Sequence, residues 1–90
     1  MPRKLRWTRR ALGRLDEIAS YIARDNPERA STFVGELRQR LEVLRVHAIG
    51  RAGRVYGTRE LVLHRHYVAV YRVIGDEVHI LTIQHSAQRR

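Results

Sequence analysis

The chain lacks cysteine altogether and has a single lysine, Lys4. Without cysteine, neither a disulfide framework nor a thiolate metal site can form. The histidines follow none of the spacings typical of zinc sites, so we predict no metal and no cofactor. No apolar run is long enough for a membrane span or for the core of a signal peptide. We therefore expect a soluble, cytoplasmic protein without a membrane partner.

Acidic residues are also scarce. Nine of them face 18 basic residues, which gives a formal net charge of +9 at pH 7. A preference for arginine codons explains why the bases are arginine rather than lysine, but it does not explain their excess over the acids. Such a charge attracts polyanions and acidic protein surfaces. We therefore expect a nucleic acid or an acidic protein as partner.

With 90 residues, of which 43% are hydrophobic, the chain has room for one domain that spans its whole length. Alternation over residues 3–7 predicts a short strand. Helical periodicity follows over residues 9–24, and again from residue 27 to about residue 46. Thr8 and Asn26 are suited to cap these helices, and the short joint between them predicts an antiparallel helical hairpin.

Each predicted helix carries one apolar stripe, which we expect to pack on the sheet. In the first helix the stripe consists of Leu12, Leu15, Ile18, Ala19 and Ile22. In the second helix it consists of Ala30, Phe33, Val34, Leu37, Leu41 and Leu44. Both helices should therefore bury one side and leave most of their charged residues to solvent.

Residues 47–58 are rich in glycine and predict a loop, and three strands follow it. Strict alternation puts Arg59 and Glu60 on opposite faces, and it puts Thr82 on the same face as Ile80. The predicted order is β-α-α-β-β-β. This is an α+β fold in which the helical hairpin packs on a mostly antiparallel four-stranded sheet. We expect the short basic tail at residues 86–90 to fray.

Three arginines lie where they could bind a phosphate or an acidic partner. Arg51 and Arg54 belong to the glycine-rich loop, whose backbone could approach a phosphate closely. The same pattern also suits a plain hinge with solvated arginines. Arg59 begins a strand beside this loop, from which its side chain could reach a phosphate or a carboxylate.

Arg72 lies in the middle of a predicted central strand, where an arginine is costly to bury without a partner. Two alternatives follow. The side chain either forms an ion pair with Glu60 or Glu77, or it projects from the open face of the sheet toward a ligand.

His85 ends the last predicted strand, where it is held by the sheet and still reaches solvent. Such a position suits proton transfer near neutral pH, although a solvated strand-end histidine is the plainer interpretation. Metal-free RNA cleavage needs a base, an acid and cations on the phosphate. Glu60 or His85 could move the proton, but most basic proteins would meet these requirements.

Over nearly its whole length the chain resembles the RelE/ParE superfamily of bacterial toxins from type II toxin–antitoxin modules. The resemblance is carried by LRWTRRALGRLDEIASYIARDNPERA, the loop GRAGRVYGTRELV, the strand pair HYVAVYRVIGDEVHILTIQH and the ending HSAQRR. It implies the same β-α-α-β-β-β order. It also implies a cytoplasmic toxin that forms a hetero-oligomer with a cognate antitoxin, which wraps around it and neutralises it.

The superfamily divides by target: RelE-like members cut mRNA on the ribosome, and ParE-like members poison DNA gyrase. Nuclease members typically carry an arginine directly after a tyrosine early in the third strand of the fold. In this chain Val68 follows the corresponding Tyr67. The tail also lacks the tyrosine that nuclease members tend to have. The pair Tyr71-Arg72 and the closing His85 are more similar to ParE-type members.

The resemblance thus implies a growth-arresting toxin that poisons gyrase. The candidate residues for binding the target or a phosphate are Arg51, Arg54, Arg59, Tyr71, Arg72 and His85. The alternative is a ribosome-dependent mRNA endonuclease, for which His85, Arg59 and Glu60 are the catalytic candidates. A third interpretation is a basic binding module without toxicity.

For the antitoxin we expect an acidic or amphipathic segment that docks on the helical hairpin and the sheet edge. The excess positive charge should accelerate this encounter.

Overall fold

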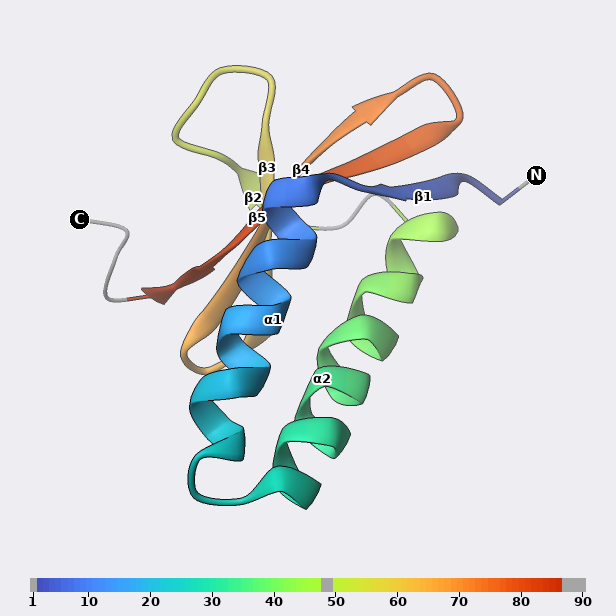
Figure 1. Ribbon diagram of the computed structural model, residues 1–90. Coiled ribbons are helices and arrows are strands. Elements are labelled where there is room, and N and C mark those ends of the chain that lie inside the picture. Colours follow the sequence, from blue (N-terminus) through green and yellow to red (C-terminus); the bar gives the residue numbers. More distant parts are fainter. Residues whose placement is uncertain (1, 48–49, 87–90) are drawn as a thin grey trace.

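The computed structural model describes residues 2–47 and 50–86. The elements in chain order are β1 (Lys4–Trp7), α1 (Arg9–Ala23), α2 (Pro27–Glu42), the 3-10 turn η1 (Val43–Arg45), β2 (Arg51–Ala52), β3 (Arg59–His64), β4 (Tyr67–Ile74) and β5 (Glu77–His85). They form a five-stranded sheet in the order β1-β5-β4-β3-β2, with α1 and α2 lying side by side against it (Figure 1). β1 pairs with β5 in parallel, and the other neighbouring strands are antiparallel. The predicted α+β class and mostly antiparallel sheet are confirmed.

The sheet has one strand more than predicted. Arg51 and Ala52 were expected to belong to a loop, but they pair with Glu60 and Arg59 as the short edge strand β2. A pairing of two residues leaves no periodicity in the sequence, which is why the prediction missed it. The predicted fraying of the tail concerned residues 86–90, of which residues 87–90 lie outside the described residues. The N–H of Ser86 donates a hydrogen bond to the His66 carbonyl at 2.7 Å.

Both helices begin at the predicted caps. The Thr8 hydroxyl accepts a hydrogen bond from the backbone N–H of Ala11 at 3.1 Å, and the Asn26 side chain accepts one from Arg29 at 3.0 Å. Caps of this kind contribute about 1 kcal/mol each. Proline at the first position of α2 fits the same boundary, because its missing N–H would have no helical partner there. In the part of the chain that the structure describes, neither helix is long and apolar enough to span a membrane.

The core lies between the helical hairpin and one face of the sheet. The predicted stripe of α2 is confirmed: Phe33, Leu37 and Leu41 are at most 5% exposed. In α1 the prediction was wrong for Leu12, which is 43% exposed, while Ala11 is fully buried. A small side chain at the first turn allows the start of α1 to approach the sheet closely, and the larger leucine turns outward.

Strand β5 departs from strict alternation after Ile80. The register to β4 shifts there, so that Leu81 is an extra residue, a β-bulge. Ile83, rather than Thr82, therefore faces the helices and is completely buried. The prediction that Thr82 shares the face of Ile80 was wrong for this reason. The Thr8 hydroxyl lies 2.8 and 3.0 Å from the carbonyl oxygens of Ile80 and Leu81, so α1 begins at the bulge.

The loop between β2 and β3 has no room for a side chain at Gly53. A Cβ atom there would lie 2.1 Å from Thr58 Oγ1, whereas a Cβ atom on Gly35 in α2 would meet nothing within 4 Å. We expect Gly53→Ala to lower the free energy of unfolding by about 1–3 kcal/mol, because the crowded loop must shift. Gly35→Ala should raise it by about 0.5–1 kcal/mol, because alanine loses less backbone entropy in a helix.

Urea unfolding of the two glycine variants measures both effects. A Gly53→Ala protein as stable as the parent would show that the loop is not packed as described.

Candidate functional site

The register of the sheet distributes the predicted site residues over two faces. Cross-strand partners share a face. Arg59 pairs with Tyr71, which is fully buried in the core that the helices cover. Glu60 and its partner Val70 lie on the opposite side, which we call the outer face. Arg51 pairs with Glu60 and therefore belongs to the outer face as well.

The outer face is hollowed beside the β2–β3 loop. This depression, which we call the outer hollow, has a volume of about 320 Å³. Its lining includes the guanidinium-bearing residues Arg10, Arg54 and Arg72 together with the apolar Val70. The loop passes over Arg72, since a Cβ atom on Gly57 would lie 3.9 Å from Arg72 Nε. Among residues 2–47 and 50–86, none of these three arginines forms an ion pair.

The two acids considered as partners of Arg72 form ion pairs with other residues. Glu60 lines the outer hollow but is only 4% exposed, and its carboxylate lies 3.4 Å from Arg51 Nε. Glu77 pairs with Arg6 at 2.9 Å and with His79 at 3.0 Å. Of the two alternatives for Arg72, the structure therefore favours projection from the open face.

Arg59 and Tyr71 form a separate contact on the helix-covered side. The Arg59 side chain donates a hydrogen bond to the Tyr71 hydroxyl. Burial raises the pKa of Tyr71, while the charges of Arg59 and Arg3 act in the opposite direction. A fully buried tyrosine cannot touch a target directly, so Tyr71 serves to hold Arg59 rather than to form a surface.

His85 lies at the other end of the sheet. It pairs with Tyr67 on the helix-covered side, with the two rings edge to face at 5.3 Å, and it stacks on His66 at 5.5 Å. The β4 partners of Arg59 and His85 are Tyr71 and Tyr67. Their separation along β4 corresponds to roughly 13 Å of strand. The predicted catalytic set of His85, Arg59 and Glu60 is therefore not brought together at one point.

A second depression lies between α1 and the end of β5. It has a volume of about 340 Å³, and we call it the helix groove; its lining consists of Arg14, Glu17, Ile18, Tyr21, Tyr67 and His85. Arg14 Nε donates to the Ile83 carbonyl at 2.9 Å, and its Nη1 pairs with Glu17 at 2.9 Å. Tyr21 is 70% exposed, so the groove offers an open aromatic surface beside charged groups of both signs.

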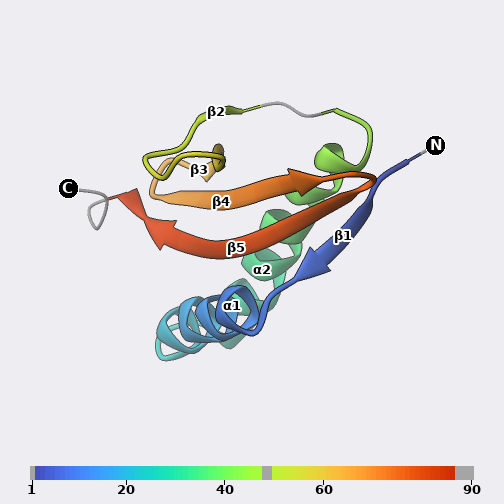
Figure 2. The ribbon, with the colours of Figure 1, turned by 90° about the horizontal axis from the view of Figure 1, so that it is seen from above.

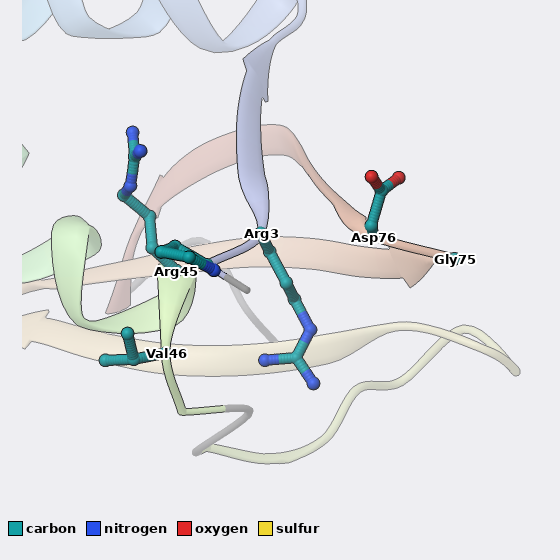
Figure 3. A pocket seen from close by; sticks show the side chains of 6 residues that line it. Arg3, Arg45, Val46, Gly75 and Asp76 are labelled. Carbon is teal, nitrogen blue, oxygen red and sulfur yellow. The ribbon is translucent and has the colours of Figure 1, made fainter.

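A third depression, with a volume of about 560 Å³, lies near the start of β1. Figure 3 shows that its charged side chains diverge: Arg45 and Asp76 point away from the Arg3 guanidinium. Because no polar groups converge there, we do not regard it as the functional site. No cluster of His, Asp or Glu suited to a metal ion occurs within the described residues.

Sequence reasoning missed Arg10 and Tyr21. The sequence predicted only that most charged residues of the first helix face solvent, Arg10 among them, whereas the bulge in β5 brings Thr82 and Gln84 beside Arg10 in the outer hollow. The one feature of the sequence that could have indicated a place for Arg10 beside the sheet is its position in the first helical turn, directly after a predicted strand.

Glu77 connects the start of β5 to β1 through a pH-sensitive contact. His79 and Arg6 donate hydrogen bonds to its carboxylate, both at 3.0 Å, and hold the pKa of Glu77 below its ordinary value. A lowered pKa in the folded state adds stability above the ordinary carboxylate pKa, and this stability is lost as the pH falls through the folded value. We expect Glu77→Gln to be less stable than the parent at neutral pH, with the difference shrinking below about pH 4.

Thermal unfolding of both proteins across this range measures the Glu77 effect. A difference that does not change with pH would argue against an ionised Glu77 as its source.

Comparisons with known proteins agree on one family. The family model described as "ParE toxin of type II toxin-antitoxin system, parDE" matches residues 5–90 of this chain. The chain is 44% identical over 89 residues to "Putative toxin Y4kP" of Sinorhizobium fredii (strain NBRC 101917 / NGR234), covering 97% of this chain and 92% of that protein.

Solved structures give the same result. A chain of the chromosomal ParDE toxin–antitoxin system from P. aeruginosa superimposes with a TM-score of 0.85 at 35% identity, covering 92% of this chain and 95% of that one. A chain of the toxin–antitoxin complex RelBE2 from Mycobacterium tuberculosis shares the fold, with a TM-score of 0.62 at 21% identity and coverage of 94% and 99%.

The fold and these likenesses together define a toxin of the RelE/ParE superfamily from a type II toxin–antitoxin system. Within it, the chain belongs to the ParE toxin family.

Proposed function

We propose that this toxin arrests growth by poisoning DNA gyrase and that a cognate antitoxin neutralises it in a hetero-oligomeric complex. The proposal places the protein in the cytoplasm, where gyrase acts. It is supported by the 35% identical chain from a ParDE system, whose fold matches over nearly the whole length.

The outer hollow is the observation that carries the proposal. Three arginines line it without ion-pair partners among residues 2–47 and 50–86, which suits an acidic surface. Neither predicted proton-transfer group is exposed in the hollow, because Glu60 is buried beside Arg51 and His85 lies on the other face. Val68, which stands where a nuclease would carry a cation, is 3% exposed and adds no charge. Such a surface suits the binding of an acidic partner, and the two predicted proton-transfer groups are not placed on it for cleavage.

Purified toxin tests the proposal in gyrase supercoiling and cleavage assays. We expect loss of supercoiling and accumulation of cleaved DNA at micromolar toxin, both reversed by the antitoxin. The alternative endonuclease would leave gyrase active and cut messages in a translating extract. That cutting would be lost in His85→Ala or Arg59→Ala.

For the antitoxin we propose docking of an acidic or amphipathic segment in the helix groove. Tyr21 offers exposed aromatic surface there, the mostly buried Ile18 lines the groove, and Arg14 contributes a positive charge that it shares with Glu17. The net charge of +9 should steer an acidic segment toward the toxin, so the association rate should fall as salt is added.

Tyr21→Ala tests this docking. Exposed aromatic side chains of this kind are frequent anchors of interfaces, and we expect a loss of antitoxin affinity of about tenfold or more. Isothermal titration with the isolated partners measures it. Unchanged affinity would place the antitoxin elsewhere on the toxin.

A further inference from the structure

The loop between β2 and β3 carries two exposed apolar residues in a row that the core of the fold does not require. Tyr56 is 99% exposed, and its neighbour Val55 is 64% exposed. Single apolar residues on a surface are common, but an aromatic ring held wholly in solvent beside an exposed valine buries nothing in the isolated protein. We call these two residues the loop tip.

The backbone of the loop tip is bridged by hydrogen bonds at its base. The backbone N–H and the hydroxyl of Thr58 both donate to the Val55 carbonyl, at 3.0 and 2.6 Å. The N–H of Gly53 donates to the Thr58 carbonyl at 2.8 Å, and Thr58 itself is only 7% exposed. A surface that is ordered before it binds loses less entropy on association. The backbone that carries Val55 and Tyr56 is therefore partly ordered before a partner binds, although their side chains project into solvent.

The loop tip borders the basic outer hollow. Arg54 and Val55 line that hollow together with Arg72, so the tip and the cations form one continuous surface. In Figure 2, β4 and β5 lie between β3 and the body of α1. Arg10 in the first turn of α1 also lines the outer hollow, whereas Tyr21 of the helix groove lies in the last turn of this helix. A partner seated on the loop tip and the outer hollow would thus leave the helix groove accessible.

We propose that the loop tip is the anchor by which the toxin grips its protein target, with Tyr56 inserted into an apolar pocket whose rim is acidic. The proposal rests on the proposed function in taking the target to be a protein. The Tyr56 ring alone could stack on a nucleic-acid base, but the adjoining Val55 adds an aliphatic side chain whose burial needs an apolar pocket. Arg54 and Arg72 form no ion pair with another described residue, and their charges beside the tip match an acidic rim.

The test compares two exposed tyrosines: Tyr56, which adjoins Val55 of the outer hollow, and Tyr21, which lines the helix groove. Tyr56→Ala, Tyr56→Phe and Tyr21→Ala are each assayed for gyrase inhibition, for growth arrest on expression and for antitoxin affinity, with circular dichroism and thermal unfolding as checks on folding. We expect Tyr56→Ala to weaken gyrase inhibition at least about tenfold. Its antitoxin affinity should stay within about twofold of the parent. Tyr56→Phe should retain inhibition because the ring, not the hydroxyl, fills the pocket, and Tyr21→Ala should show the reverse pattern.

Two results would overturn the proposal: unchanged inhibition by Tyr56→Ala, or an equal loss of antitoxin affinity, which would make the tip an antitoxin contact. Failure of the proposed function looks different, because the unmodified toxin would then leave gyrase active. In that case growth arrest decides the role of the tip. If Tyr56→Ala toxin arrests growth as strongly as the parent, the loop tip is not an anchor for the target. A specific loss of growth arrest would support the loop tip as an anchor for a target other than gyrase.

Discussion

Replacing Arg72 with leucine is expected to weaken gyrase inhibition by about 100-fold. Arg72 is half-buried in the central strand β4, and its side chain lines the outer hollow without an ion-pair partner among the described residues. A partner carboxylate that loses this cation would remain desolvated and unpaired, at a cost of about 2–5 kcal/mol. Each 1.4 kcal/mol or so corresponds to a tenfold loss of affinity. Dose–response curves in the supercoiling assay measure the effect.

Arg24→Leu is the matched control for Arg72→Leu. It removes the same charge from an exposed position at the C-terminal end of α1, remote from the outer hollow. We expect this variant to inhibit gyrase like the parent, and we expect both variants to unfold at nearly the parent temperature. Equal losses in the two variants would mean that net charge alone, rather than the outer hollow, governs the inhibition.

Ile83→Ala is expected to lower the free energy of unfolding by about 2–5 kcal/mol, whereas Thr82→Ala should change it by about 0.5 kcal/mol or less. Ile83 is completely buried between β5 and the helices, packed with residues such as Phe33 and Leu37. Thr82 lies on the outer face and lines the outer hollow. The two alanine variants should differ in unfolding free energy because the bulge at Leu81 turns Ile83 toward the helices and Thr82 toward the outer face.

Urea unfolding of these two variants therefore measures the register of β5. Without the bulge, strict alternation would bury Thr82 with Ile80 and the order of the two effects would be reversed. A larger loss in Thr82→Ala than in Ile83→Ala would contradict the described register.

The features predictable from the sequence are those set by neighbours along the chain. Thr8 and Asn26 cap helices because their side chains reach N–H groups three residues on. The stripe of α2 follows from helical spacing, and the central place of β4 follows from its apolar residues on both faces. Alternation along β3 correctly separated Arg59 from Glu60, so these two residues could not act on one phosphate from the same face.

What could not be predicted depends on contacts between distant segments. The bulge is stabilised where α1 begins at β5, through Thr8, which lies more than seventy residues earlier in the chain. Strand β2 forms only because two residues meet the start of β3. The outer hollow joins Arg10 of α1 to Arg54 of the loop and Arg72 of β4, and no spacing in the sequence relates these three. Candidate residues could be named from chemistry, but their grouping required the fold.

The order of events after toxin expression tests the central claim most directly. In one culture, the supercoiling of a reporter plasmid, the induction of the DNA-damage response and the rate of protein synthesis are followed from the moment of induction. A toxin that poisons gyrase should relax the plasmid and induce the damage response before protein synthesis falls. A fall in protein synthesis that comes first, with supercoiling intact, would contradict gyrase as the target.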